Sequence, residues 1–527
     1  MKKHLFFAAT ALAMLASCSQ SDDLSAPVVA ENTQPQAIEF GTYVGKNVNT
    51  RAGQTGSITS AQVLANKGGF GVFAYYTGDN DYLGTTSVNP TTTPVTLTTP
   101  QASAMAPNFM YNQQIEGTDA TTPVWTYSPV KYWPNGNTTA DDQDNNAGDH
   151  PAEGSLGGKV SFFAYAPYVT KAAADGTGTG IISMSDNSAT GNPTITYKMQ
   201  AGNANPVDLL WGTAGTNGYK AQDGTVDNSG NYIAVDPGTP KWADRPFAVN
   251  ANLTKMKVQG KVQFAFKHAL AKVGGSNVTT TPPSTNGLQV MLDVDNGTAE
   301  TGGTYDNTTT KVTVSDITIT ARAKVDADAT PGPDKYLTPA GNQGTLDLAT
   351  GQWTIDVATS SNVTADKATA SSVTHQITTS GSGSANASLN TTIAEPTTAL
   401  ATGTAAWDGL VEGVLTTAKN VYADEANPLV YIPGTYPELD VEITYITRTK
   451  DASLAKGYSE VPQTVKKTLT FTKPVQLNKQ YNLIIRLGLT SVKFDATVSD
   501  WDPDTDSDGD VDGDDTKEIN LPINVSD

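Results

Sequence analysis

The chemically most distinctive stretch of this sequence is an acidic segment near its carboxyl end. Over residues 504–515, carboxylates fall at the first, third, fifth, ninth and twelfth positions, with glycine at the sixth and an apolar residue at the eighth. This is the spacing of a calcium loop, in which alternate oxygens reach one cation and glycine permits the sharp turn. The candidate ligands are Asp504, Asp506, Asp508, Asp510, Asp512 and Asp515.

Two features separate this segment from an EF-hand. Asp515 stands where glutamate would give a longer bidentate reach, and no helical pattern flanks the loop. Repetitive Asp and Gly residues also form solvated, self-repelling linkers. The sequence therefore leaves two interpretations open, a calcium site or an acidic spacer. No other cofactor is suggested, and none is required.

Histidine and cysteine are too scarce for most enzyme chemistry. The four histidines, His4, His150, His268 and His375, lie in unrelated contexts, and there is one cysteine. The sequence has no nucleophile elbow, zinc-binding helix motif or phosphate loop. His268 lies in an apolar stretch, as a hydrogen-bonded core histidine does. We expect no enzyme, with only a glycosidase-like pair of carboxylates left open, since any two acids can meet in space.

The cysteine, Cys18, lies where an export signal ends. A basic start precedes an apolar run of about ten residues, which is too short for a membrane span and suits a secretory signal. The sequence Leu15-Ala16-Ser17-Cys18 resembles a bacterial lipobox. It predicts that Cys18 is the lipidated first residue of the exported chain, held on a membrane by two or more acyl chains such as palmitate.

Charge and composition exclude several other classes. The chain has 53 Asp and Glu against 33 Lys and Arg, a net charge of −20, so it lacks the basic surface that nucleic acids require. Ten acids and one base lie within residues 500–518, so nearly half of the imbalance belongs to the acidic segment. Beyond the amino terminus no apolar stretch is long enough to span a bilayer as a helix, so the lipid is the only membrane contact expected.

The elements that carry these features are predicted to be strands. β-Branched and aromatic runs bounded by Gly, Pro and Asn favour an all-β fold of two tandem antiparallel sandwiches with long loops and few short helices. Strands are predicted at 38–44, 69–76, 160–165, 257–266, 311–321, 351–357, 439–447, 464–471, 481–489 and 492–498, and helices at 60–66 and 406–420. Loops are predicted at 86–104, 136–157, 171–192, 215–240, 275–309 and 359–404.

The final residues have the clearest two-residue period. Ile519, Leu521, Ile523 and Val525 alternate with polar residues, and Pro522 on the polar face favours an edge or inserted strand. Full burial of four such side chains would contribute about 6–12 kcal/mol before the entropy of ordering is subtracted. The strand can add to a sheet of another subunit, or it can complete the sandwich of its own chain.

Six segments carry a family resemblance when they are taken in order after the lipobox. They are Thr50–Ala52, Gly69–Tyr76, Trp125–Pro134, Phe162–Pro167, Asp208–Trp211 and Val262–Val273. Together they resemble the fimbrillin family, the type V pilin subunits of Bacteroidia. The resemblance and the aromatic character of the segments agree that Trp125, Trp133, Phe162 and Trp211 are core residues rather than a ligand cage.

The resemblance implies transthyretin-like sandwiches that assemble by strand exchange. A lipoprotein precursor reaches the surface of the outer membrane, and a trypsin-like protease cuts after an arginine. The first strand then leaves, and an extended segment of another subunit takes its place in the fimbrium. Arg51 follows strand 38–44 in a polar stretch, so Arg51-Ala52 is the candidate bond, with Lys46 as a secondary one.

This interpretation divides the chain into six parts. They are a signal peptide (1–17), a lipidated tether with a removable first strand (18–51), an N-terminal sandwich (52–250), a C-terminal sandwich (251–499), the acidic linker or calcium loop (500–518) and the candidate donor strand (519–527).

Two functions of different classes remain. The first is a structural fimbrial subunit that contributes to adhesion, with other subunits, the protease and host or bacterial receptors as partners. The second is a monomeric surface lipoprotein adhesin whose Thr- and Asn-rich loops bind glycans or host proteins. A fimbrial anchor subunit that stays uncleaved is a variant of the first.

The calcium interpretation can be tested by thermal unfolding. If residues 504–515 bind calcium in the folded chain, millimolar calcium should raise the melting temperature relative to chelator, because a ligand that binds only the folded state stabilises it. Replacing Asp504 and Asp508 by Asn should abolish the shift. An equal melting temperature in calcium and chelator would leave the acidic-spacer interpretation.

Overall fold

A computed structural model describes most of the predicted strands. The described residues are 36–44, 61–78, 82, 104–120, 122–134, 158–174, 178–199, 207–214, 249–258, 260–274, 288–292, 309–325, 334–378, 407, 410, 419–420, 429–487, 492–500, 519–520 and 523–526. The all-β prediction is confirmed. The helices among these residues are short: α1 (Ala61–Asn66), α2 (Lys171–Ala174) and α3 (Lys255–Val258). None of them has the length and hydropathy of a membrane span.

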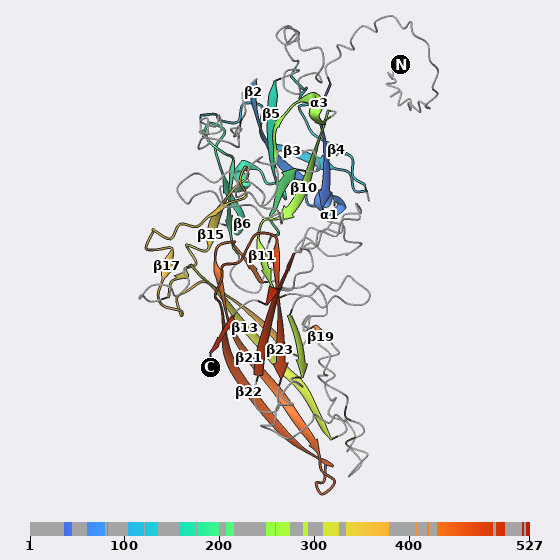
Figure 1. The fold of residues 1–527 in the computed structure, drawn as a ribbon, viewed down its shortest axis with the longest axis vertical. Helices are drawn as coiled ribbons and strands as arrows, with labels where there is room; N and C mark the ends of the chain where they lie inside the picture. Colours follow the sequence, from blue (N-terminus) through green and yellow to red (C-terminus); the bar gives the residue numbers. More distant parts are fainter. Residues whose placement is uncertain are drawn as a thin grey trace, which may run out of the picture.

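The first half of the molecule is organised around an eight-stranded sheet, in the upper part of Figure 1. In sheet order its strands are β1 (Glu39–Val44), β10 (Lys261–His268), β8 (Leu210–Ala214), β5 (Lys159–Ala166), β2 (Phe70–Gly78), β3 (Met110–Gly117) and β4 (Trp125–Thr126), and β9 (Asn250–Leu253) also pairs with β5. The first two strands run parallel, and the other pairs are antiparallel.

Both faces of this sheet are buried, which explains the apolar runs in β2 and β5. On one face Phe70, Val72 and Phe162 pack with residues of β1 and β10. On the other face Phe73 and Tyr165 pack against a second, smaller sheet. That sheet contains β6 (Gly180–Met184), β7 (Thr194–Lys198), β15 (Gln343–Asp347) and β16 (Trp353–Thr354).

The second half is a sandwich of two sheets. One sheet consists of β19 (Lys419–Asn420), β12 (Leu288–Leu292), β23 (Lys479–Leu487), β11 (Ala271–Val273), β20 (Leu429–Tyr431), β24 (Val492–Asp500) and β25 (Ile519–Asn520). The other consists of β17 (Val363–Thr364), β14 (Tyr336–Leu337), β13 (Thr310–Lys324), β21 (Tyr436–Lys450), β22 (Tyr458–Phe471), β26 (Ile523–Ser526) and β18 (Ser372–Thr378). Their inner faces share one apolar core, and the β21–β22 hairpin reaches the lower end of the molecule (Figure 1).

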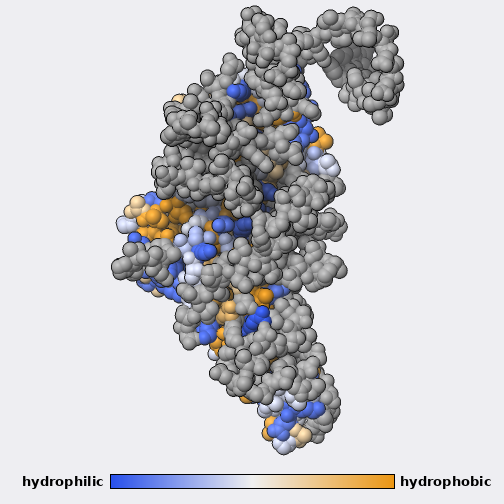
Figure 2. Space-filling model, in the orientation of Figure 1, coloured by the Kyte–Doolittle hydropathy of each residue, from blue (hydrophilic) through white to orange (hydrophobic). Residues whose placement is uncertain are grey.

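Strand pairing joins the two halves across the expected division at residue 250. β9 spans that point and β10 follows it in the sequence, but both belong to the first sheet. In the opposite direction, β15 leaves the second half and pairs with β7 of the first over five residues. A segment of the second half therefore completes a sheet of the first. Figure 2 shows apolar residues gathered on the flank where this segment lies. Val357, a few residues after β16, is 46% exposed.

Several local predictions were wrong. The predicted loops at 171–192, 275–309 and 359–404 contain β6, β12 and β18. β6 pairs with the next strand, β7, whereas β12 and β18 pair with distant strands. Of the predicted strand 351–357 only Trp353–Thr354 pairs, because a turn with Gly351 at φ +73° precedes it and an Asp356 loop follows. In the predicted helix 406–420, residues 419–420 form β19.

Candidate functional site

The candidate site is the first strand, β1, which lies at the edge of the eight-stranded sheet. β1 alternates as predicted: Ile38 and Phe40 are buried and Glu39 between them is exposed. It pairs in parallel with β10 over six residues, from Glu39–Lys261 to Val44–Phe266. It is the edge strand of its sheet, so it can leave without breaking any other ladder of that sheet.

The Phe40 side chain enters a group of aromatic rings. Its ring centroid lies 5.3 Å from that of Tyr127, 5.9 Å from that of Phe162, 6.1 Å from that of Phe264 and 6.3 Å from that of Phe70. Three of the four contacts are edge-on, the arrangement that aromatic quadrupoles favour. The edge strand thus supplies the central ring of the core inside the first sheet.

The residues just before β1 are held by a second segment. The Ile38 amide donates to the Lys131 carbonyl at 2.9 Å, and the Trp133 amide donates to the Gln36 carbonyl at 3.0 Å. An isolated bridge pairs Ala37 with Tyr132. Because residues 131–133 follow β4, the strand at the opposite edge, the two ends of the eight-stranded sheet meet at residues 36–38.

Two side chains of this second segment reinforce the junction. The Tyr127 hydroxyl donates to the Ile38 carbonyl at 2.9 Å and accepts from the Lys131 amide at 3.2 Å. The Trp133 indole donates to the Gly260 carbonyl at 2.9 Å, which also accepts the Glu39 amide at 3.2 Å. Gly260 has φ +83°, a backbone conformation that residues with a side chain rarely adopt, so glycine is favoured at this position.

β1 also carries one imperfection. The Thr42 hydroxyl oxygen is buried and has no hydrogen-bond partner among the described residues. A buried polar group without a partner costs about 1–3 kcal/mol. The strand is therefore held by apolar burial and ladder bonds against an unfavourable contribution from its own side chain.

Most of the other predicted site residues lie in parts of the chain that the structure does not describe. Cys18, Arg51, Ala52 and Leu521, together with all six candidate calcium ligands, lie outside the described residues. Within the described residues no cluster of three or more His, Cys, Asp or Glu side chains could hold a metal.

The carboxyl-terminal strand pairs within its own chain in this structure. β25 adds to β24 through Ile519–Val498 and Asn520–Thr497. β26 adds to β22 over four pairs, from Ile523–Phe471 to Ser526–Thr468. The tail therefore joins one edge of each sheet of the second sandwich, the arrangement that the sequence left open beside donation to another subunit.

His268 is a core histidine. Its Nδ1 lies 2.9 Å from Asp208 Oδ1, and both side chains are 4% exposed. The pair sits where β10 ends, and the His268 amide donates to Asn478 Oδ1 of the second half at 3.2 Å. It contributes to the junction of the halves.

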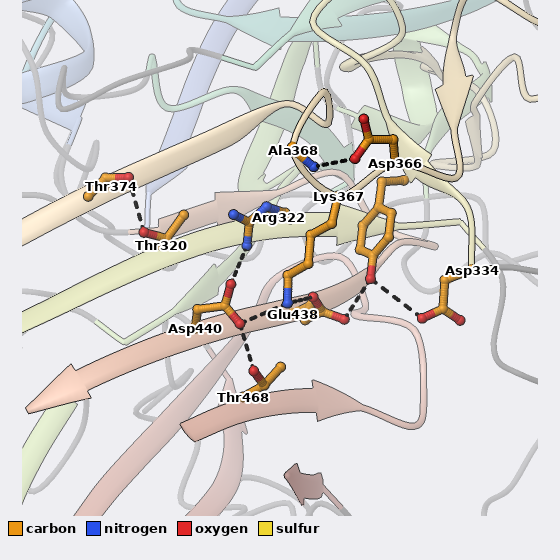
Figure 3. Close-up of polar contacts among 11 residues, drawn as sticks. Thr320, Arg322, Asp334, Asp366, Lys367, Ala368, Thr374, Glu438, Asp440 and Thr468 are labelled. Atoms are coloured by element: carbon orange, nitrogen blue, oxygen red, sulfur yellow. Dashed lines mark hydrogen bonds and ion pairs between the residues drawn. The ribbon is translucent and has the colours of Figure 1, made fainter. Parts of the chain in front are cut away.

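A charged cluster lies on the second sandwich (Figure 3). Lys367 Nζ lies 2.7 Å from Glu438 Oε1 and 2.8 Å from Asp440 Oδ1. Asp440 also accepts from Arg322 at 2.6 Å and from the Thr468 hydroxyl at 2.7 Å. The Tyr336 hydroxyl donates to Glu438 at 3.0 Å. Sequence analysis missed this cluster, because its members come from distant strands and show no motif.

The pKa values of Asp440 and Lys367 are shifted in the directions that keep both groups charged, as in an ion-pair network. Burial alone raises the pKa of Asp440, but hydrogen bonds from Lys367, Thr468 and Arg322 hold it below its usual value. Burial alone lowers the pKa of Lys367, but its two carboxylate partners raise it above the usual value. Both groups stay charged at neutral pH. The cluster therefore binds the Lys367 segment to β21 instead of exchanging protons.

Comparisons with known proteins show similarity over part of the chain. No family model matches the chain. The curated protein fimbrium subunit Fim1C of Phocaeicola vulgatus is 31% identical over 169 residues, which are 32% of this chain and 34% of that protein. The match thus spans about a third of the relative's length. The resemblance to fimbrial subunits seen in the sequence motifs agrees with this match.

A comparison with solved structures gives one further match. It is a fimbrial protein from Bacteroides vulgatus, 17% identical, with a TM-score of 0.48, and the alignment covers 88% of this chain and 99% of that chain.

Replacing Phe40 by Ala should loosen β1 selectively. The truncation removes the central ring of the aromatic group, and large-to-small changes of this type cost about 3–5 kcal/mol. Amide exchange of residues 39–44, measured by mass spectrometry, should become much faster. The matched control is Glu39→Ala, which removes an exposed side chain from the same strand and should leave exchange nearly unchanged. Equal exchange in both variants would contradict the role given to Phe40.

Replacing Asp440 by Asn should lower stability at neutral pH and much less in acid. Because the pKa of Asp440 is lowered in the folded state, its contribution is present above its ordinary value of 3.8 and is lost as the pH falls through the folded value. Urea unfolding at pH 7 and pH 3 should show a difference from wild type that shrinks at pH 3. The control is Glu442→Gln. Glu442 lies on β21, as Asp440 does, and its exposed ion pair with Lys466 of β22 contributes little, so this change should have little effect at either pH.

Proposed function

We propose that this protein is a structural subunit of cell-surface fimbriae that joins its neighbours by exchange of β1. The observation that carries the proposal is the placement of Phe40: an edge strand, parallel to its partner, fills the aromatic core of the first sheet. Removal of such a strand leaves an elongated apolar groove, and refilling it with a strand of another subunit is β-augmentation. The partial match to a fimbrium subunit supports the same class.

In this proposal the precursor is an outer-membrane lipoprotein anchored through Cys18. A trypsin-like surface protease cuts between Arg51 and Ala52, seven residues beyond Val44, the end of β1. The fragment that contains β1 also contains Cys18, so its loss would release the remaining chain from the membrane. The released chain would expose its groove only when β1 departs.

The proposed donor is the tail with Ile519, Leu521, Ile523 and Val525. Its apolar residues repeat with the two-residue spacing of Ile38 and Phe40 in β1. A strand with this pattern can direct one set of side chains into the groove and the other into solvent. Donation requires β25 and β26 to leave their places on β24 and β22.

A second candidate is a subunit that ends or anchors the fibre, or a surface adhesin that does not polymerise. The pairing of β25 and β26 within their own chain favours it, because a chain that keeps its tail has no strand to donate. In that case the groove of β1 would still accept a tail from another subunit, or β1 would remain in place.

The two candidates predict different surface polymers. The shaft subunit predicts a mature amino terminus at Ala52 and a detergent-resistant ladder on immunoblots of sheared surface material. Arg51→Ala should abolish both, and deletion of residues 519–527 should abolish the ladder but not the cut. Lys46→Ala, which removes the nearest other basic residue, is the matched control and should leave the ladder intact.

Other outcomes have equally definite meanings. A ladder that survives deletion of residues 519–527 would assign this chain to a fibre end. Uncleaved monomer in every strain, including wild type, would overturn exchange of β1 and leave the anchor or adhesin.

A further inference from the structure

The segment from Tyr127 to Trp133 contacts the residues just before β1 and can hold β1 in the sheet. It follows β4 and runs antiparallel to the residues just before β1. Its contacts act on residues 36–38, the amino-terminal end of the removable strand. The proposed cut after Arg51 lies on the other side of β1. A chain cut there would still hold β1 at the end remote from the cut.

Tyr127 is the central residue of this segment. Its hydroxyl donates to the Ile38 carbonyl at 2.9 Å, and its ring lies against the ring of Phe40 at 5.3 Å between centroids. One side chain thus contacts the backbone on one side of Glu39 and the side chain on the other. Burial raises the pKa of the Tyr127 hydroxyl, with the Lys131 amide opposing in part, so the hydroxyl remains a donor at neutral pH.

Trp133 also connects the segment to Gly260, which precedes β10 and bonds to Glu39 of β1. The indole of Trp133, 3% exposed, donates to the same Gly260 carbonyl that accepts the Glu39 amide. The missing Cβ of Gly260 leaves room for the Gln36 side chain. Residues 36–39 are therefore bonded on both sides, to Gly260 and to residues 131–133, whereas residues beyond Phe40 have described ladder bonds to β10 alone.

We propose that residues 127–133 are a latch that sets how fast β1 leaves the first sheet, with Tyr127 as its positioning residue. The proposal rests on the proposed exchange of β1 for its biological meaning, but its physical content concerns the uncut chain. After a cut at Arg51, β1 would peel from Val44 toward Ile38, and the latch would be the last contact to break. The groove would then stay filled until an incoming strand competes for it.

The test is hydrogen exchange on the uncleaved precursor, with Tyr127→Phe as the main variant. This change keeps the ring against Phe40 and removes only the hydroxyl. Exchange of residues 39–44 should become about three- to tenfold faster, the effect of one net hydrogen bond. Exchange in β5, at the centre of the same sheet, should not change. Tyr132→Phe is the matched control: it removes a hydroxyl from the same segment, and Tyr132 is 50% exposed with no hydroxyl contact to β1 among the described residues.

Each outcome decides the proposal. Faster exchange in β1 alone, for Tyr127→Phe but not Tyr132→Phe, supports the latch. Unchanged exchange, an equal acceleration in β1 and β5, or the same effect from both variants overturns it. If Tyr127→Phe does not fold, Trp133→Phe replaces it, because it removes the indole bond to Gly260, and the same comparison with β5 applies.

A second measurement separates the latch from the proposed function. After cleavage at Arg51, release of the fragment that ends there should be faster in Tyr127→Phe than in wild type or Tyr132→Phe. If the exchange result supports the latch but no variant polymerises, the fimbrial function fails and the latch stands. If polymers form while β1 exchange is the same in all variants, the latch fails and the function stands.

Discussion

The structure of the first half depends on the burial of one ring carried by an edge strand. Phe40 lies among four aromatic side chains that come from β2, β5, β10 and the segment after β4. The interior of the sheet is therefore complete only while β1 is present. Because β1 is parallel to β10, more than 200 residues away in the sequence, no tight hairpin connects them. A strand with this connection can be replaced without changing the order of the strands that remain.

The two halves are tied together by more than the chain that links them. The indole of Trp211 in β8 donates to the Leu348 carbonyl, and the indole of Trp353 in β16 donates to the Ala269 carbonyl, both at 2.8 Å. Gly351, with φ +73°, lies so close to the Trp211 ring that a Cβ would overlap it. After β15 and β16, the ion pairs of Lys367 with Glu438 and Asp440 attach the chain to β21 of the second half. The two halves are therefore joined by packed side chains as well as by the backbone.

The sequence was most informative where apolar pattern and length were both strong. The runs of β2 and β5, the alternation of β1 and the long strands β13, β21 and β22 could be predicted, since local pattern determines them. Strands such as β12 and β18 could not, because they are ordered by pairing with distant strands, β23 and β13. The same reason hid the partner of β1, the return of β15 to the first half and the Tyr127 contacts. Trp125 and Trp133 were predicted to be core residues; Trp133 is buried, whereas Trp125 is partly buried. The bonds of this segment to residues 36–38 required the fold.

The tail and β1 differ in how well each would fill the groove. In their own sandwich β25 and β26 have two and four ladder pairs, whereas β1 has six with β10. The longer ladder favours moving the tail into an empty groove. Yet Leu521 or Ile523 would replace the larger ring of Phe40, and Pro522 would lack one amide donor. Against this, an apolar residue at the position of Thr42 would remove a buried hydroxyl that has no partner among the described residues. In the proposed exchange, a tethered β1 would be present at high local concentration and would compete well against a tail from solution. A cut after β1 would remove that advantage, so proteolysis would favour strand exchange in the proposed mechanism.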